Sequence, residues 1–115
     1  MAEEKVYVDV ADGVKRVMNN LGLYVKLLGK FKEDKSMKDL VNQLSAGDLE
    51  KAQITAHTLK GLASNLSLTE LFERTRDLES QIKERAVQDG ALDALKAVYE
   101  ETLKKADEVI ATNAS

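Results

Sequence analysis

Residues 49–66 have the sequence LEKAQITAHTLKGLASNL, and the spacing within this stretch decides the fold. Its apolar side chains recur three or four residues apart, as on one buried face of an α-helix. They are Leu49, Ala52, Ala56, Leu59, Ala63 and Leu66. We therefore expect an amphipathic helix whose apolar seam packs against other helices.

Turn signals flank this helix on both sides. Before it, Gly47 suits the left-handed backbone that follows a helix, and Asp48 suits an N-cap. After it, Ser67 and Glu70 have the spacing of a capping box, so we expect the next helix to begin at Ser67. The pair Asp89-Gly90 predicts the break before a last helix.

Helical periodicity also covers the N-terminal half of the chain. Residues 6–10 alternate like a strand, but an isolated strand has nothing to pair with, so we expect an extended lead-in. Asp9 predicts the N-cap of a short first helix whose apolar face includes Met18. The stripe of a second helix then loses its register, and Ser36 resembles the start of a third. A single kinked helix over residues 21–45 is the alternative.

The loops between the later helices are short, which favours antiparallel neighbours. We therefore expect an all-α protein, namely an antiparallel four-helix bundle with short N-terminal helices packed on it. Residues 1–115 are expected to form one domain with its core over about residues 9–111. Acidic pairs such as Asp77 and Glu79 are expected on solvated helix faces.

Composition excludes several classes of site. The 115 residues contain no Cys and one His, which excludes disulfides, thiolate metal sites and multi-histidine metal sites within one chain. The formal net charge of −3 argues against a nucleic-acid partner bound through a basic face. No signal peptide or membrane-spanning run is visible, so we expect a cytoplasmic protein with no membrane partner.

The single histidine lies on the solvent side of the expected helix. His57 is about 130° from the centre of the apolar seam, and Lys60 and Gly61 share its face. Gly61 costs about 1 kcal/mol relative to Ala in a helix interior, yet it leaves room beside the imidazole for another molecule or a bulky group. Lys60 could support a phosphoryl group on the ring. The same pattern also fits an ordinary surface histidine on a charged face.

The run AHTLKG at residues 56–61 resembles the signature of the histidine-containing phosphotransfer (HPt) domain family. Three residues that follow fit the same pattern: Ala63, Asn65 and Leu66. Further stretches that look typical of the family lie at suitable distances: Leu28-Gly29-Lys30-Phe31, Ala46-Gly47-Asp48 and Leu78-Glu79. The resemblance covers about residues 9–110, which is nearly the whole chain.

Two positions depart from the family pattern. The family commonly has Gly where this chain has Ser67, and we expect Ser67 to preserve the turn as an N-cap. Leu62 is bulkier than the Ala or Ser often found there, and it lies about 90° from the centre of the seam. Neither departure affects His57 or Lys60.

The resemblance implies a phosphorelay role in which His57 accepts a phosphoryl group through Nε2. Lys60, Gly61 and Ser64 are then expected to support the phosphate. The residues expected to dock a receiver domain also include Gln53, Ile54 and Leu62. No Gly-rich nucleotide loop is present, so the resemblance implies a phosphocarrier and not an autonomous kinase.

The implied partners are response-regulator receiver domains and a sensor or hybrid histidine kinase. The chain itself is expected to bind no metal or cofactor, because the receiver supplies the aspartate and Mg²⁺. We expect a monomer. The alternative function is a non-transferring HPt-like helical adaptor that binds receiver or kinase domains.

Overall fold

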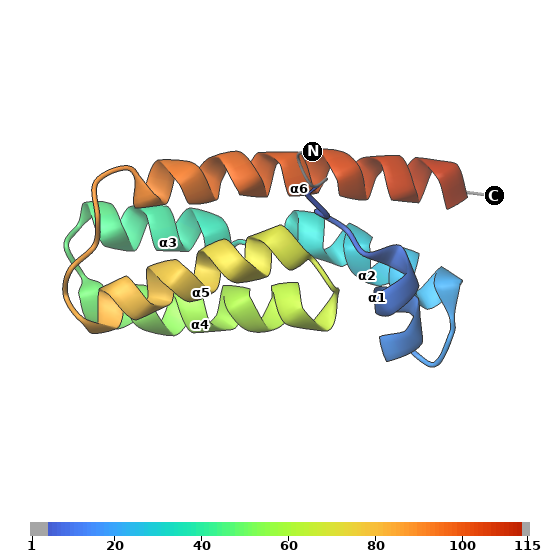
Figure 1. Ribbon diagram of the computed structural model, residues 1–115, viewed down its shortest axis with the longest axis horizontal. Coiled ribbons are helices and arrows are strands. Elements are labelled where there is room, and N and C mark those ends of the chain that lie inside the picture. Colours follow the sequence, from blue (N-terminus) through green and yellow to red (C-terminus); the bar gives the residue numbers. More distant parts are fainter. Residues whose placement is uncertain (1–4, 114–115) are drawn as a thin grey trace.

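The computed structural model describes residues 5–113, and all regular structure in that range is helical. The helices are α1 (Val10–Arg16), α2 (Leu21–Glu33), α3 (Ser36–Ser45), α4 (Leu49–Asn65), α5 (Thr69–Lys83) and α6 (Ala91–Asn113). Figure 1 shows α3 to α6 aligned along the long axis, with α2 roughly continuing the line of α3 and α1 at one end. This arrangement confirms the all-helical prediction.

The long helices pack against one another. Successive helices from α3 to α6 run in opposite directions along the molecule (Figure 1). Helix α4 contacts α3 and α5, while α6 contacts α5 and α2. Helix α1 packs on α2. The short connections between the helices fit the antiparallel packing of neighbours.

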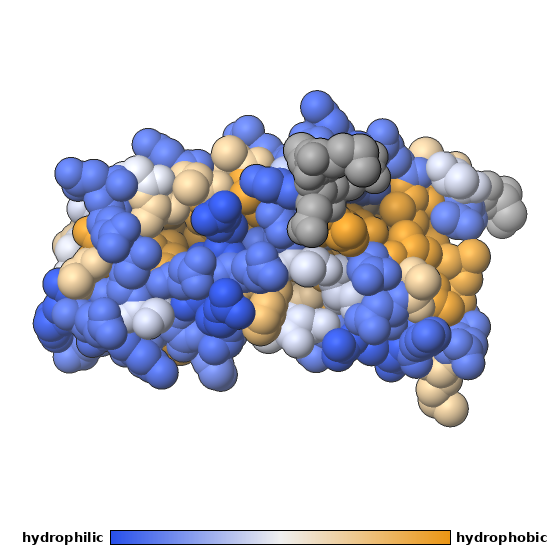
Figure 2. Space-filling view, viewed as in Figure 1, coloured by the Kyte–Doolittle hydropathy of each residue, from blue (hydrophilic) through white to orange (hydrophobic). Residues whose placement is uncertain are grey.

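The apolar seam of α4 forms the centre of the core. Its residues Ala52, Ala56, Leu59 and Ala63 are fully buried. Hydrophilic side chains cover most of the face shown in Figure 2, and apolar ones are most visible between α1 and the last turns of α6. Because the seam of α4 faces inward, the opposite side of this helix faces solvent.

Several helix ends follow the expected cap chemistry. The side chains of Asp9, Asn20 and Asp48 each accept a hydrogen bond from the backbone N–H three residues further on. Gly47 and Gly90 have left-handed φ values of +74° and +82° at the turns before α4 and α6. These residues fix where α1, α2, α4 and α6 begin.

The N-terminal half agrees with the prediction of separate second and third helices and differs from the prediction in one detail. Asp34 interrupts the chain so that α2 and α3 are separate helices, and its carboxylate accepts a hydrogen bond from the Ser36 N–H at 2.8 Å. Ser36 is the first residue of α3, as the predicted start of a third helix requires, and Lys35 occupies the N-cap position. Met18 has a left-handed φ of +60° and is exposed, so its prediction on the apolar face of α1 is wrong. The left-handed turn rotates its side chain away from that face.

Ser67 does not cap α5. Its φ is +57°, α5 begins at Thr69, and Leu68 occupies the N-cap position without a side-chain cap bond. A capping serine needs an extended backbone, whereas the left-handed backbone of Ser67 directs its hydroxyl to Asp12 of α1 at 2.5 Å. This conformation explains why glycine suits the position.

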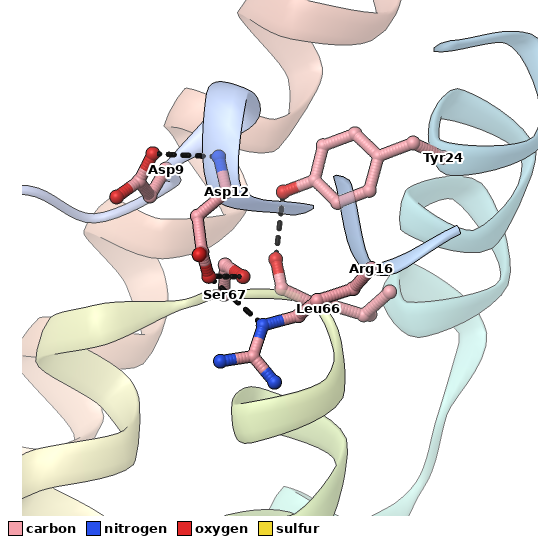
Figure 3. Close-up of polar contacts among 6 residues, drawn as sticks. All are labelled: Asp9, Asp12, Arg16, Tyr24, Leu66 and Ser67. Atoms are coloured by element: carbon pink, nitrogen blue, oxygen red, sulfur yellow. Dashed lines mark hydrogen bonds and ion pairs between the residues drawn. The ribbon is translucent and has the colours of Figure 1, made fainter. Parts of the chain in front are cut away.

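The turn between α4 and α5 is fastened to the N-terminal segment. Figure 3 shows the Tyr24 hydroxyl donating to the Leu66 carbonyl oxygen at 2.7 Å, and Asp12 accepting from Ser67 and Arg16. The Asp9 N–H donates to the Ser67 carbonyl oxygen at 3.0 Å. We call this set of contacts the α4–α5 junction. It ties α1 and α2 to the end of α4.

The extended segment before α1 also packs close to this junction. The Glu70 N–H donates to the Val6 carbonyl oxygen at 3.3 Å, so the segment before α1 lies along the start of α5.

Burial raises the pKa of Tyr24 to about 12, with the charges of Asp9 and Asp12 adding to the effect. Tyr24 therefore keeps its hydroxyl hydrogen at neutral pH and can donate it to the Leu66 carbonyl oxygen.

We expect Tyr24→Phe to lower the free energy of unfolding by about 1–3 kcal/mol, because it leaves the buried Leu66 carbonyl without its donor. Urea unfolding followed by circular dichroism measures this change. The control is Tyr99→Phe, whose ring packs edge-on against Phe31 and whose hydroxyl lies outside the junction. Equal losses in the two variants would contradict a special role for the Tyr24 hydroxyl.

Candidate functional site

The only histidine of the chain lies on the solvent face of α4. His57 is near the middle of this helix, and its side chain is 73% exposed. The seam on the opposite side of α4 is buried, so packing of the bundle fixes the direction in which His57 points. This position agrees with the sequence prediction.

A buried carboxylate from α5 contacts the histidine and a neighbouring lysine. Glu79 Oε2 lies 3.2 Å from His57 Nδ1, and Glu79 Oε1 lies 2.6 Å from Lys60 Nζ. The Glu79 side chain is only 5% exposed, whereas that of Lys60 is 26% exposed. Both oxygens of one carboxylate therefore connect α5 to the solvent face of α4.

The prediction that Glu79 belongs to a solvated face is wrong, although Asp77 is indeed exposed. Positions that are two residues apart in sequence lie about 200° apart around a helix, so Asp77 and Glu79 point to nearly opposite sides of α5. Glu79 instead shares a stripe with Thr75, Leu78 and Ile82, which are all buried. Counted from Thr75, the residues Leu78, Glu79 and Ile82 follow after three, four and seven positions. This helical spacing could have identified Glu79 as a buried residue from the sequence.

The charge of Glu79 is maintained by its neighbours. Burial raises the pKa of this carboxyl, but the hydrogen bond and the positive charge of Lys60, with a smaller contribution from His57, outweigh burial and hold the pKa below its usual value. Glu79 is therefore ionised at neutral pH. An ionised carboxylate only accepts hydrogen bonds, so a hydrogen bond here is donated by His57 Nδ1–H, and in the neutral ring the lone pair then lies on Nε2.

Gly61 provides open space on the same face. A Cβ atom at this position would meet no neighbouring atom within 4 Å. Packing within the described part of the chain therefore does not require glycine here, although glycine costs about 1 kcal/mol relative to alanine in a helix interior. The space beside His57 is thus available to another molecule.

The other predicted site residues divide into two groups. Ile54 is 69% exposed and Gln53 is half-buried, and both lie one turn before His57. Ser64 lies on the same face, but about 10.5 Å further along the helix axis. Leu62 is about 140° around α4 from His57, so it faces a different flank. There it lines a groove with Val17, which follows α1, and with Leu27 and Phe31 of α2.

The family model described as Hpt domain matches residues 27–105, which is more than half of the chain. The chain belongs to the Hpt domain family. Hpt domains act in histidine phosphotransfer in two-component signalling, with receiver domains and kinases as their partners. Neither the comparison with curated proteins nor the comparison with solved structures gives a match.

The matched range holds the residues of the site. It contains α3, α4 and α5 entirely, and therefore His57, Lys60 and Glu79. Across residues 5–113 of this Hpt domain, no helix is long and apolar enough to span a membrane. Within the same range, no three His, Cys, Asp or Glu side chains are grouped so that they could hold a metal ion.

The lowered pKa of Glu79 predicts how the free energy of unfolding changes at acidic pH. Since the folded-state pKa lies below the ordinary value of 4.5, the charged carboxylate stabilises the fold above about pH 4.5, and this contribution is lost as the pH falls through the folded-state value. We expect the free energy of unfolding of the wild type to decline more steeply below pH 5 than that of Glu79→Gln. Urea unfolding at a series of pH values tests this, and parallel curves would contradict it.

Proposed function

We propose that this Hpt domain accepts a phosphoryl group on His57 and passes it to or from the aspartate of a response-regulator receiver domain. The observation that carries the proposal is the exposed imidazole whose Nδ1 contacts a buried, ionised carboxylate within a chain of this family. In the neutral ring, a hydrogen on Nδ1 leaves the lone pair on Nε2, which acts as the nucleophile. A sensor or hybrid histidine kinase is the proposed source of the phosphoryl group.

The proposed reaction is a direct transfer between two side chains. The lone pair of His57 Nε2 attacks the phosphorus of the receiver's aspartyl phosphate, and the bond from phosphorus to the carboxylate oxygen breaks with its electron pair on that oxygen. The receiver contributes the aspartate that carries the phosphoryl group. It also contributes Mg²⁺, which stabilises the negative charge of this group during the transfer. The Hpt domain contributes the nucleophile and the Lys60 ammonium beside it, so it acts as a phosphocarrier.

Receiver docking is proposed for the solvent face of α4. Ile54 offers an exposed apolar side chain one turn from His57, and Gly61 offers space for close approach. Gln53 borders the same face. Leu62 is proposed to contact the receiver at the side of the docking surface. Ser64 is proposed to contact the receiver at the end of this surface, because about 10.5 Å of helix rise separates Ser64 from His57.

The proposed scaffold is the antiparallel four-helix bundle expected from the sequence, with α2 and α3 together serving as one of its four members. The order of helix contacts and the directions in Figure 1 support this assignment. We also propose that the protein is a monomer and that it is cytoplasmic, as expected from the sequence.

The experiment that tests the proposal is intact-mass spectrometry after incubation with a panel of phosphorylated receivers and Mg²⁺. We expect the wild type to gain one phosphoryl mass that is labile in acid and stable in alkali, and His57→Gln to gain none. A modified His57→Gln protein would refute the assignment of the site. If receivers bind the wild type without phosphorylating it, the protein is instead a non-transferring adaptor.

Gly61→Ala separates docking from stability. Because the added methyl group meets no neighbour, we expect the free energy of unfolding to rise by about 1 kcal/mol, as helix propensity predicts. The larger variant Gly61→Leu should block transfer by obstructing the receiver while the protein stays folded. Stopped-flow transfer rates and urea unfolding of both variants provide the measurements. Normal transfer to Gly61→Leu would contradict the need for space at this position.

A further inference from the structure

We propose that the groove beside Leu62 is a binding site for a small amphipathic carboxylate, with Arg16 contacting the carboxylate and apolar side chains contacting the hydrocarbon part. We call it the Leu62 groove, and its apolar lining consists of Val17, Leu27, Phe31, Leu62 and Leu66. The inference goes beyond the proposed function and does not depend on phosphorylation of His57.

The Leu62 groove has the size and the apolar lining of a ligand site. Its volume is about 590 Å³, within the range of about 300–1,000 Å³ typical of small-molecule sites. Phe31 and Leu66 are buried and close the bottom of the groove, while Val17, Leu27 and Leu62 are half-buried around it. A hydrocarbon chain in the groove would therefore remove water from apolar surface that the fold itself leaves uncovered.

The charged side chains of the groove favour an anion. Arg16 and Lys30 supply two positive charges, and Asp34 supplies one negative charge. The Asp34 carboxylate already accepts a hydrogen bond from the Ser36 N–H at 2.8 Å. Asp34 also follows Lys30 by four residues at the end of α2, so these two charges partly offset each other. Arg16 is therefore the cation that remains for a ligand.

The guanidinium of Arg16 is held in place and still has donors to offer. Its Nε donates to Asp12 Oδ2 at 2.9 Å, and Figure 3 shows both Nη groups pointing away from Asp12. Asp12 is itself bound by the Ser67 hydroxyl at the α4–α5 junction. Arg16 can thus keep this contact while its Nη groups donate to a carboxylate. Asn65 also lines the groove and adds an amide donor next to Leu66.

The class of ligand follows from combining these two features. A carboxylate at Arg16 and an alkyl chain along Leu27 and Phe31 would use both the cation and the apolar lining. A neutral hydrocarbon of the same length would gain only the apolar contacts. A cationic amphiphile would be repelled by Arg16. We therefore assign the groove to an anion with one apolar chain.

A segment of the receiver is the competing occupant, because Leu62 also borders the proposed docking surface. His57 and Leu62 lie about 140° apart around α4. A receiver centred on His57 therefore reaches Leu62 only at its side, and the rest of the groove lies further from His57, towards α2. This separation favours an occupant of its own for the Leu62 groove.

The proposal is tested by NMR titration of ¹⁵N-labelled protein with sodium octanoate, below the concentration at which octanoate forms micelles. We expect saturable binding, with the largest amide shifts at Val17, Leu27, Phe31 and Leu62. Octanol and octyltrimethylammonium match the chain length but lack the negative charge. Each should bind at least about 10-fold more weakly, as expected for loss of a hydrogen bond between charged groups. Equal affinities, or shifts centred outside the groove, would overturn the proposal.

A pair of variants tests the role of Arg16. The measure is the ratio of the dissociation constants of octanol and octanoate, because a change in groove shape weakens both ligands. We expect Arg16→Gln to lower this ratio about 10-fold. The matched control is Lys15→Gln, which removes the same charge from an exposed neighbour that does not line the groove. An unchanged ratio in Arg16→Gln, or an equal decrease in Lys15→Gln, would refute the assignment of Arg16.

A titration with an unphosphorylated receiver separates the two occupants. If octanoate leaves the amides of Leu27 and Phe31 unshifted while the receiver shifts them, the groove belongs to the receiver interface and the proposal is overturned. The proposed function fails in a different way: if no receiver phosphorylates His57, phosphoryl transfer is refuted, whereas saturable binding of octanoate still supports a ligand site in the Leu62 groove.

Discussion

Close packing along the alanine seam of α4 is the constraint on which the rest of the structure depends. Ala52, Ala56 and Ala63 are fully buried, and small side chains let neighbouring helices approach closely. Helix α4 contacts α3 and α5 there. Once this seam is inside, the rotation of α4 is fixed, and His57 must face outward. The direction of the imidazole is therefore set by apolar contacts on the other side of its own helix.

The same packing brings a carboxylate to the histidine. Glu79 belongs to the inward stripe of α5, where an unpaired charge would be costly. Lys60 and His57 compensate for that cost from α4, so the charges couple the two helices at the point where the apolar seam meets the solvent face. The polar site thus exists before any partner arrives, and the bundle holds its geometry in place.

The sequence predicts the parts of this structure that depend on local rules. The seam of α4, the turn at Gly47 and Asp48, and the exposure of His57 follow from periodicity and cap chemistry, and the structure agrees. Other features depend on residues that are distant in the chain. The left-handed backbone of Ser67 belongs with a hydrogen bond to Asp12, 55 residues away, and no local pattern distinguishes it from a capping box.

Glu79 shows a different limit of prediction. Its charge suggested a solvated position, whereas its spacing from Leu78 and Ile82 placed it in the buried stripe. Periodicity was the better guide here, because Lys60 lies close enough to compensate the buried charge. That compensation depends on how two helices pack, which the spacing within either helix alone does not determine.

The α4–α5 junction has a consequence for where this domain can be cut. The match to the family begins at residue 27, yet Tyr24 donates to the carbonyl oxygen of Leu66, the residue that caps the histidine helix, and Asp12 binds the turn after it. A fragment trimmed to the recognisable pattern would keep every residue of the phosphotransfer site and lose the groups that finish the helix carrying it. The matched range is therefore shorter than the part of this chain that completes its histidine helix.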